Sequence, residues 1–233
     1  LLSPITVKRY HELLDTFEHY KKTNKILDIG CGDGYFLREA KNRGWQVYGT
    51  EFSDHAYEIG KKKGITMHKG ILNPENYSFR DFDVITSFEV IEHINNPKEE
   101  VENINKLLRT GGLFYFTTPN FNSISRLISK LPWNVILYPE HLSYYTAGSM
   151  NRFLTKKGFE KIKIETTGIS FSRLQATNNP KKQHSAQKKK LTDEEIRQKT
   201  ETKFVFKLIK SCANFTLNLF KMGDSLKGYY QKK

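Results

Sequence analysis

The chain has 233 residues, of which 37% are hydrophobic and 13% aromatic, which is enough for a folded core and too much for a disordered chain. No apolar stretch approaches the roughly 20 residues of a membrane span, and the first residues lack the basic-then-apolar profile of a signal peptide. The two cysteines, Cys31 and Cys212, show no disulfide or zinc-site spacing, so we expect a reducing, cytoplasmic setting.

The formal net charge of +13 has two interpretations. It could reflect an anionic partner such as nucleic acid, an acidic glycan or a lipid head group. The favoured interpretation is a lysine-rich composition spread over solvated faces. The tightest basic cluster comprises Lys181, Lys182 and residues 188–190.

Up to Pro119, strand and helix patterns alternate. A helix is predicted over residues 4–20, where apolar residues recur at helical spacing. Short apolar runs predict five strands, at residues 25–30, 46–52, 65–70, 82–88 and 112–119. Further helices are predicted at residues 34–44, 53–64 and 97–108, with a turn at 110–112 before the fifth strand. This alternation predicts an α/β fold with a doubly wound, parallel sheet.

After Pro119 the pattern is looser. Residues 121–145 are predicted to form a lid or substrate-binding segment, followed by a helix capped by Thr146 and a sixth strand at 160–168. Residues 175–192 are polar and basic, as in a loop. Helical periodicity returns over residues 193–221, which favours a packing helix, with a membrane-surface or partner helix as the alternative. A last strand is predicted near residues 225–231.

The stretch ILDIGCGDGYF carries the strongest functional signal. Gly30, Gly32 and Gly34 lie between a predicted strand and a predicted helix, where the backbone must turn sharply and a ligand can approach closely. Asp28 would repel a pyrophosphate but attract a ligand that carries an ammonium and a sulfonium. Glu51 ends the second strand, where an acidic residue can accept both ribose hydroxyls, and the neighbouring Phe52 can lie against an adenine.

These features resemble the class I S-adenosylmethionine-dependent methyltransferases over most of the chain. LDIGCGDG, the acidic end of the second strand, FDVI before a helix and LLRTGGLFYFTTPN all match that pattern in order. The resemblance implies a mostly parallel seven-stranded sheet whose last strand is antiparallel. It divides the chain into an N-terminal helix (1–24), a cofactor-binding core (25–174), an insertion (175–222) and a final strand (223–233).

The resemblance also implies cofactor contacts. Asp28, Gly30 and Gly32 would surround the methionine end of S-adenosylmethionine, and Cys31 and Gly34 would line the loop. The remaining contacts would come from Glu51 on the ribose, Phe52 on the adenine, Ile71 and Leu72 on the second adenine wall, and Phe88 beside the sulfonium. The family often has an acidic residue at this second wall, and its absence would leave that contact to backbone groups.

The stretch SFEVIEHI, residues 87–94, begins at the end of the fourth strand and offers acceptor-site residues. If residues 89–95 form a helical turn, Glu89, Glu92 and His93 share one face. His141 in PEHLSYYT is a fourth candidate. Two methyltransferase groups carry a similar set, those acting on small-RNA 2′-hydroxyls and the ubiquinone-pathway O-methyltransferases, and in the RNA group these positions hold a divalent metal. His141 could instead be a metal-free base, or the run could be structural.

The expected reaction is O-methylation of a small-molecule or glycan hydroxyl. Methyl transfer requires alignment of the acceptor, exclusion of water and, for a hydroxyl, removal of its proton. The predicted lid has two lysine or arginine residues, Arg126 and Lys130, and many apolar ones, which favours a neutral or partly apolar acceptor over a polyanion. The alternatives are a nucleic-acid methyltransferase that uses the basic insertion and a non-catalytic cofactor-binding module whose late helix contacts a membrane or partner.

Overall fold

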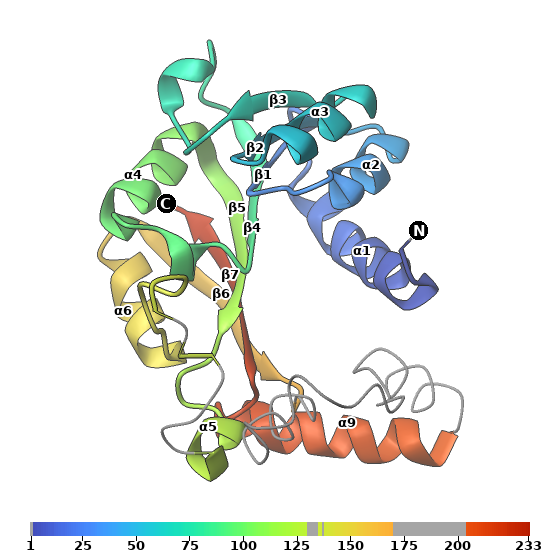
Figure 1. Cartoon of the computed structure of the whole chain (residues 1–233), viewed down its shortest axis with the longest axis vertical. Coiled ribbons are helices and arrows are strands. Elements are labelled where there is room, and N and C mark those ends of the chain that lie inside the picture. Colours follow the sequence, from blue (N-terminus) through green and yellow to red (C-terminus); the bar gives the residue numbers. More distant parts are fainter. Residues whose placement is uncertain (1, 130–134, 137, 170–203) are drawn as a thin grey trace, which may run out of the picture.

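The computed structural model describes residues 2–129, 135–136, 138–169 and 204–233 (Figure 1). Its centre is one seven-stranded sheet in the order β3-β2-β1-β4-β5-β7-β6, in which β7 is antiparallel to both neighbours and the other pairs are parallel. The strands are β1 (Lys25–Ile29), β2 (Gln46–Glu51), β3 (Thr66–Lys69), β4 (Phe82–Phe88), β5 (Leu108–Pro119), β6 (Phe159–Thr167) and β7 (Ser225–Lys232). The predicted fold class and the antiparallel last strand are confirmed.

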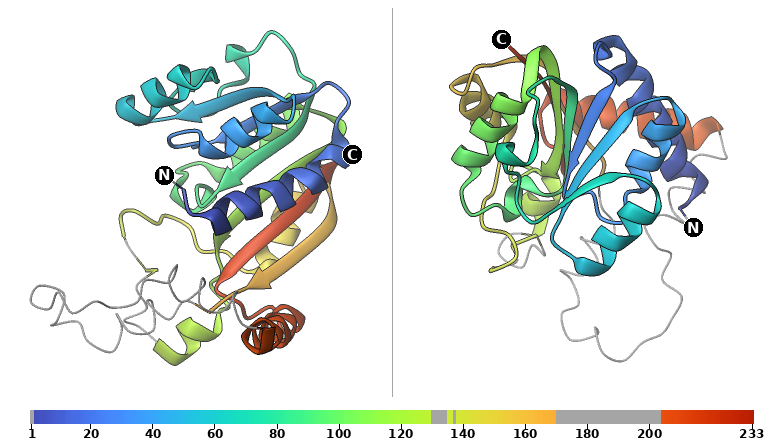
Figure 2. Two further views of the ribbon diagram at one scale, coloured as in Figure 1. Left: turned by 90° about the vertical axis from the view of Figure 1, so that its right-hand side faces the viewer. Right: turned by 90° about the horizontal axis from the view of Figure 1, so that it is seen from above.

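Helices cover both faces of the sheet. The helices α1 (Pro4–Phe17), α2 (Tyr35–Asn42) and α3 (Asp54–Lys62) lie on one face, and α4 (Pro97–Leu107) and α6 (Ala147–Thr155) on the other (Figures 1 and 2). The short 3-10 helices are η1 (Glu18–Tyr20), η2 (Pro74–Asn76) and η3 (Ile91–His93). At one end of the sheet lie α5 (Ile124–Ser129) and α9 (Phe204–Leu219).

Two apolar layers hold the helices on the sheet. Leu14 and Phe17 of α1 pack with Leu37 of α2 against one face, whereas Ile104 of α4 and Met150 of α6 belong to the layer on the other. Each of these side chains is almost fully buried. The helical spacing of apolar residues in the sequence therefore marks the faces that the sheet covers.

The fifth strand begins earlier than expected. The predicted turn at residues 110–112 is wrong, because these residues belong to β5, which starts at Leu108. The register between β4 and β5 shifts between Phe82, which pairs with Leu108, and Val84, which pairs with Leu113, so the pairing is interrupted where β5 has the extra residues. Gly111 adopts a φ of 75°, a conformation that glycine enters without steric cost.

A buried carboxylate ties the N-terminal segment to the sheet. Asp83 of β4 is fully buried, and its Oδ2 accepts backbone N–H bonds from Lys22, Thr23 and Asn24 at 2.7–2.8 Å. Its Oδ1 accepts a bond of 2.6 Å from Nε of Arg109. The segment between α1 and β1 is thereby fixed to two central strands.

The described part of α9 packs on β6 with one side and leaves apolar side chains exposed on the other. Leu217 is buried, and Asn214 and Asn218 accept backbone bonds from Gly168 and Thr166. Phe215, Leu219 and the following Phe220 are more than 60% exposed. The basic stretch at residues 181–190 and the first part of the predicted late helix lie outside the described residues. Within the described ranges, no helix is long and apolar enough to cross a membrane.

Candidate functional site

The carboxyl ends of β1, β2 and β4 lie at one level of the sheet. Ile29, the last residue of β1, pairs with Thr50 of β2 and with Ser87 of β4. The glycine loop, Glu51 and Phe88 therefore emerge side by side. The sheet order reverses between β1 and β4, and such a switch point is where open α/β sheets bind their ligands.

The glycine loop has the conformation that its sequence predicts. Gly30, Gly32 and Gly34 have φ values of 64°, 51° and 70°, in the left-handed region that favours glycine. A Cβ on Gly30 would come within 2.6 Å of Cγ2 of Val90, whereas a Cβ on Gly32 would meet nothing within 4 Å. The backbone is thus bare and open beside Gly32, which fits the close approach of a cofactor.

Glu51 holds the loop and the start of α3 together. Its Oε2 accepts a bond of 2.8 Å from the Gly32 amide, and its Oε1 accepts bonds of 2.8 and 2.9 Å from the Phe52 and Ser53 amides. The carboxylate is fixed at the end of β2, where its remaining lone pairs can accept a ribose diol.

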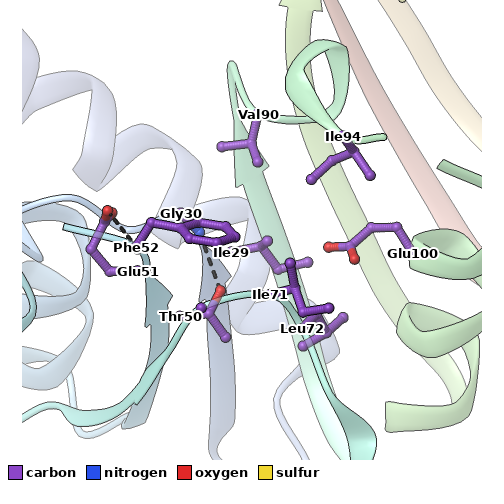
Figure 3. Close-up of a pocket in the computed structure, with 11 residues that line it drawn as sticks. Ile29, Gly30, Thr50, Glu51, Phe52, Ile71, Leu72, Val90, Ile94 and Glu100 are labelled. Atoms are coloured by element: carbon purple, nitrogen blue, oxygen red, sulfur yellow. Dashed lines mark hydrogen bonds between the residues drawn. The ribbon is translucent and has the colours of Figure 1, made fainter. Parts of the chain in front are cut away.

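Two exposed apolar side chains border a hollow next to Glu51. Phe52 is 65% exposed and Ile71 is 62% exposed, which is unusual for large apolar residues. Leu72 lines the same hollow but is buried in the core (Figure 3). Phe52 and Ile71 fit the two sides of a flat base, and Leu72 closes the floor.

Asp28 lies behind the loop, out of contact with water. Its Oδ1 accepts a bond of 2.7 Å from Oγ1 of Thr86. Burial raises the pKa of Asp28, the Thr86 hydrogen bond opposes this rise and the nearby charge of Glu51 adds to it, and together they bring the pKa to about 8. A cation placed beside this carboxyl would favour its ionised form, so the predicted role toward an ammonium group fits the site.

The side chain of Cys31 faces the core. Its Sγ lies 3.8 Å from Sδ of Met67, and a Cβ on Gly49 would come within 2.6 Å of it. Burial, followed by the charges of Asp28 and Glu51, raises the pKa of the Cys31 thiol, which disfavours the reactive thiolate form. Cys31 therefore lines the loop with its backbone.

Phe88 belongs to an aromatic group that the sequence did not reveal. Its ring lies 5.1 Å from that of Phe36, 5.5 Å from Tyr115 and 6.5 Å from Tyr10 of α1. Burial and the charge of Asp28 raise the pKa of Tyr10. Helix α1 thus brings Tyr10 to the end of the site predicted to hold the sulfonium. Its regular place on an apolar helix face gave no signal of this position.

Residues 89–95 do not form one helical turn. Only Ile91–His93 is helical, as η3, and Glu89 precedes it with a φ of 54° and an exposed side chain. Glu92 is buried, and its Oε2 accepts a bond of 2.9 Å from Oγ1 of Thr118. Burial, then the charge of Glu89, raises the pKa of Glu92 to about 7. Glu89 thus acts on Glu92 through its charge.

The predicted lid brings His141 to this run. The backbone carbonyl of Glu92 accepts N–H bonds from Leu142 and Ser143 at 2.8 and 3.1 Å. The rings of His93 and His141 consequently lie edge to face, with centroids 4.8 Å apart. One ligand atom from each of Glu92, His93 and His141 lies within 4.8 Å of the other two, and in the described part of the chain Glu89 is outside this cluster.

Both imidazoles are held in one tautomer. Nδ1 of His93 lies 2.6 Å from the carbonyl oxygen of Glu140, and Nδ1 of His141 lies 2.7 Å from that of Val135. A carbonyl can only accept, so each Nδ1 carries a hydrogen. In the neutral rings Nε2 is then the unprotonated nitrogen, free to bind a cation or to take a proton.

Comparison with known proteins agrees with this geometry. The family model for the methyltransferase domain matches residues 7–164. The chain is 26% identical over 163 residues to the ubiquinone biosynthesis O-methyltransferase of Thiobacillus denitrificans, covering 64% of this chain and 69% of that protein. It is 30% identical over 137 residues to the enzyme of the same name from Paraburkholderia phymatum, covering 56% and 57%.

Solved structures show the same fold. A SAM-dependent methyltransferase from Archaeoglobus fulgidus superposes with a TM-score of 0.63 at 19% identity, over 96% of this chain and 92% of that one. Phosphoethanolamine N-methyltransferase 2 of Haemonchus contortus, solved with S-adenosyl-L-methionine, gives a TM-score of 0.58 at 19% identity, over 97% of this chain and 52% of that one.

The chain therefore belongs to the methyltransferase domain family. It is a class I S-adenosylmethionine-dependent methyltransferase. The open glycine loop, the fixed Glu51 and the exposed pair Phe52 and Ile71 are the residues that fit its cofactor.

Proposed function

We propose that this methyltransferase acts on a hydroxyl group of a small molecule or glycan precursor, beside Glu92, His93 and His141. The convergence of these three side chains from two separate segments carries the proposal. Thr118 of β5 and Val90 after β4 link this cluster to the glycine loop, so it lies at the carboxyl ends of the strands that flank the cofactor site.

A hydroxyl acceptor must lose its proton as the new oxygen–carbon bond forms. The cofactor, when bound, supplies a methyl group on a positively charged sulfur. Nε2 of His141 or His93 is the unprotonated nitrogen and can take the hydroxyl proton. The carboxyl of Glu92 beside the rings would then stabilise the imidazolium. Amine acceptors need no such partner once they are neutral.

The same cluster fits a divalent cation. Two imidazoles and one carboxylate suit a borderline cation such as Zn²⁺, and the carboxylate also suits the harder Mn²⁺. In metal sites the second nitrogen of a histidine commonly donates to a backbone carbonyl, as Nδ1 does in both His93 and His141. Glu92, His93 and His141 would hold the ion, which would lower the pKa of an acceptor hydroxyl.

The relatives support an oxygen acceptor. The two proteins compared above are named ubiquinone biosynthesis O-methyltransferases, and the alignment with each covers more than half of this chain. At 26–30% identity this supports the class of acceptor atom, and the proposal goes no further toward their substrate.

The acceptor class is tested with labelled S-adenosylmethionine and matched pairs of small acceptors, a catechol or sugar alcohol against the amine of the same skeleton. We expect methylated hydroxyls and no methylated amines. Methylation of the amine alone would contradict the proposal.

The role of the cluster is tested by calorimetric titration of chelator-treated protein with Mn²⁺. We expect one site, lost in His141→Ala and kept in His55→Ala, which replaces an exposed histidine outside the cluster. If Mn²⁺ does not bind but His141→Ala still loses activity, the histidine acts as a base alone. If Mn²⁺ does not bind and His141→Ala keeps its activity, the cluster is structural and the proposed site is wrong.

A further inference from the structure

Glu100 is a buried acid without a visible partner. It lies in the first turn of α4 and is 7% exposed, and no hydrogen bond reaches its Oε1 from the described residues. Burial, followed by the charge of Glu99, raises the pKa of Glu100 to about 7. An unsatisfied buried carboxyl destabilises the folded state, so a polar partner absent from the cofactor-free protein would offset this cost.

The carboxyl of Glu100 points into the hollow that Phe52 and Ile71 border. Figure 3 shows Glu51 and Glu100 on opposite sides of the Phe52 ring, and in this view Ile71 lies between that ring and Glu100. The other acidic group, Glu51, is already fixed by three backbone amides. Among the described residues that line this hollow, Glu100 is therefore the acid with a buried carboxyl oxygen, Oε1, that accepts no hydrogen bond.

The adenine of the cofactor matches this arrangement. Its faces are apolar and flat, and its edge carries an exocyclic amino group that needs an acceptor. With the ribose at Glu51 and the base between Phe52 and Ile71, the far edge of the base is directed toward Glu100. We propose that Glu100 accepts a hydrogen bond from this amino group and makes the site selective for adenine.

This assignment changes the expectation from sequence that backbone groups alone recognise the base edge. The position after β3 holds Ile71, which has no polar group, and the acceptor comes instead from α4 on the opposite side of the hollow. The inference concerns the cofactor only and does not depend on which acceptor the enzyme methylates.

The test measures calorimetric affinity for S-adenosylhomocysteine and for S-inosylhomocysteine, in which a carbonyl replaces the amino group. We expect the native protein to prefer the adenine form at least tenfold, as sites built around one hydrogen bond do. In Glu100→Leu, affinity for the adenine form should fall about tenfold, and the preference should vanish. The melting temperature without ligand should stay equal or rise, because the unsatisfied carboxyl is gone.

Two further variants complete the test. Glu100→Gln, whose amide can donate to the carbonyl of the inosine form, should narrow or reverse the preference even if Glu100→Leu fails to fold. Glu99→Gln removes the same charge from an exposed neighbour and should leave both affinities within twofold. A preference that survives in Glu100→Gln would overturn the proposal. So would equal losses for the two ligands in Glu100→Leu, because a purely structural role predicts them.

Discussion

His93 and His141 lie edge to face with ring centroids 4.8 Å apart, although one follows β4 and the other ends the segment after α5. The backbone carbonyl of Glu92 holds them together by accepting two amide bonds from the residues after His141. The acceptor side of the site therefore depends on the docking of residues 138–145 onto η3.

Replacing His141 should separate catalysis from cofactor binding. His141 belongs to the cluster with Glu92 and His93, whereas the residues expected to bind the cofactor lie in the glycine loop, at the end of β2 and in the β3–η2 connection. In His141→Ala we expect turnover to fall at least tenfold, in line with loss of a general base or metal ligand, while affinity for S-adenosylhomocysteine changes less than twofold. Calorimetry and initial rates measure the two effects. Unchanged turnover with a confirmed acceptor would exclude this role.

The glycine loop can be tested with a matched pair of alanine variants. Gly32 and Gly168 both have positive φ, and a Cβ on either would meet no atom within 4 Å, so both substitutions carry a similar backbone cost of about 1 kcal/mol. Only the Cβ on Gly32 would enter the space assigned to the cofactor. We expect Gly32→Ala to weaken S-adenosylhomocysteine binding at least tenfold and Gly168→Ala to leave it unchanged. Equal affinities would place the cofactor elsewhere.

Asp28 should make stability depend on pH in the cofactor-free protein. Its pKa rises from 3.8 to about 8 on burial, so between these values the folded state holds a proton that the unfolded state lacks. The free energy of unfolding should therefore fall as pH rises from about 4 to 8, by up to about 1.4 kcal/mol per pH unit. This corresponds to roughly 2–4 °C in melting temperature per kcal/mol for a chain of this size.

Asp28→Asn provides the comparison, because an amide does not ionise. The melting temperature of Asp28→Asn should rise relative to that of the native protein as pH increases from 5 to 8. At pH 8 its affinity for S-adenosylmethionine should be lower than that of the native protein. A melting-temperature difference that stays constant over this range would show that Asp28 does not titrate there.

Asp83 should be among the most sensitive positions for stability. Removing its carboxylate leaves three backbone amides and Arg109 without their acceptor inside the protein. Breaking such a buried pair costs about 3–5 kcal/mol, so Asp83→Ala should lower the melting temperature by at least about 6 °C. The control is Glu75→Ala, which breaks the exposed pair with Arg80 and should shift it by less than about 2 °C. Similar shifts in both variants would contradict the assigned role.

Much of the fold and of the cofactor loop was predictable, because both follow from local patterns. Glycine spacing fixes where the backbone can turn, and apolar periodicity fixes which helix faces meet the sheet. Glu51 was predictable for the same reason, since it ends a strand next to the glycine loop. Its three backbone amides could not be seen from the sequence.

The acceptor side was harder to predict because long-range contacts build it. Glu89 seemed to share a helical face with Glu92 and His93, but the backbone turns sharply at Glu89 before η3 begins. Tyr10 reaches the site only through the packing of α1. Glu100 did leave a signal, since it lies four and seven residues before Ile104 and Leu107, on the buried face of α4. An acidic side chain on such an apolar helix face is costly to bury unless a polar group binds it, so its presence indicates a missing partner.

The position of β7 between β5 and β6 sets an order for biosynthesis. β6 ends at Thr167, and the strand that joins it to the rest of the sheet begins only at Ser225. While the ribosome makes the intervening segment, β5 has an unpaired backbone edge and β6 has no partner strand. The nascent chain can therefore finish its sheet only late in translation, and premature termination before β7 would release a protein in which β5 has an open edge and β6 has no partner strand, both of which favour aggregation.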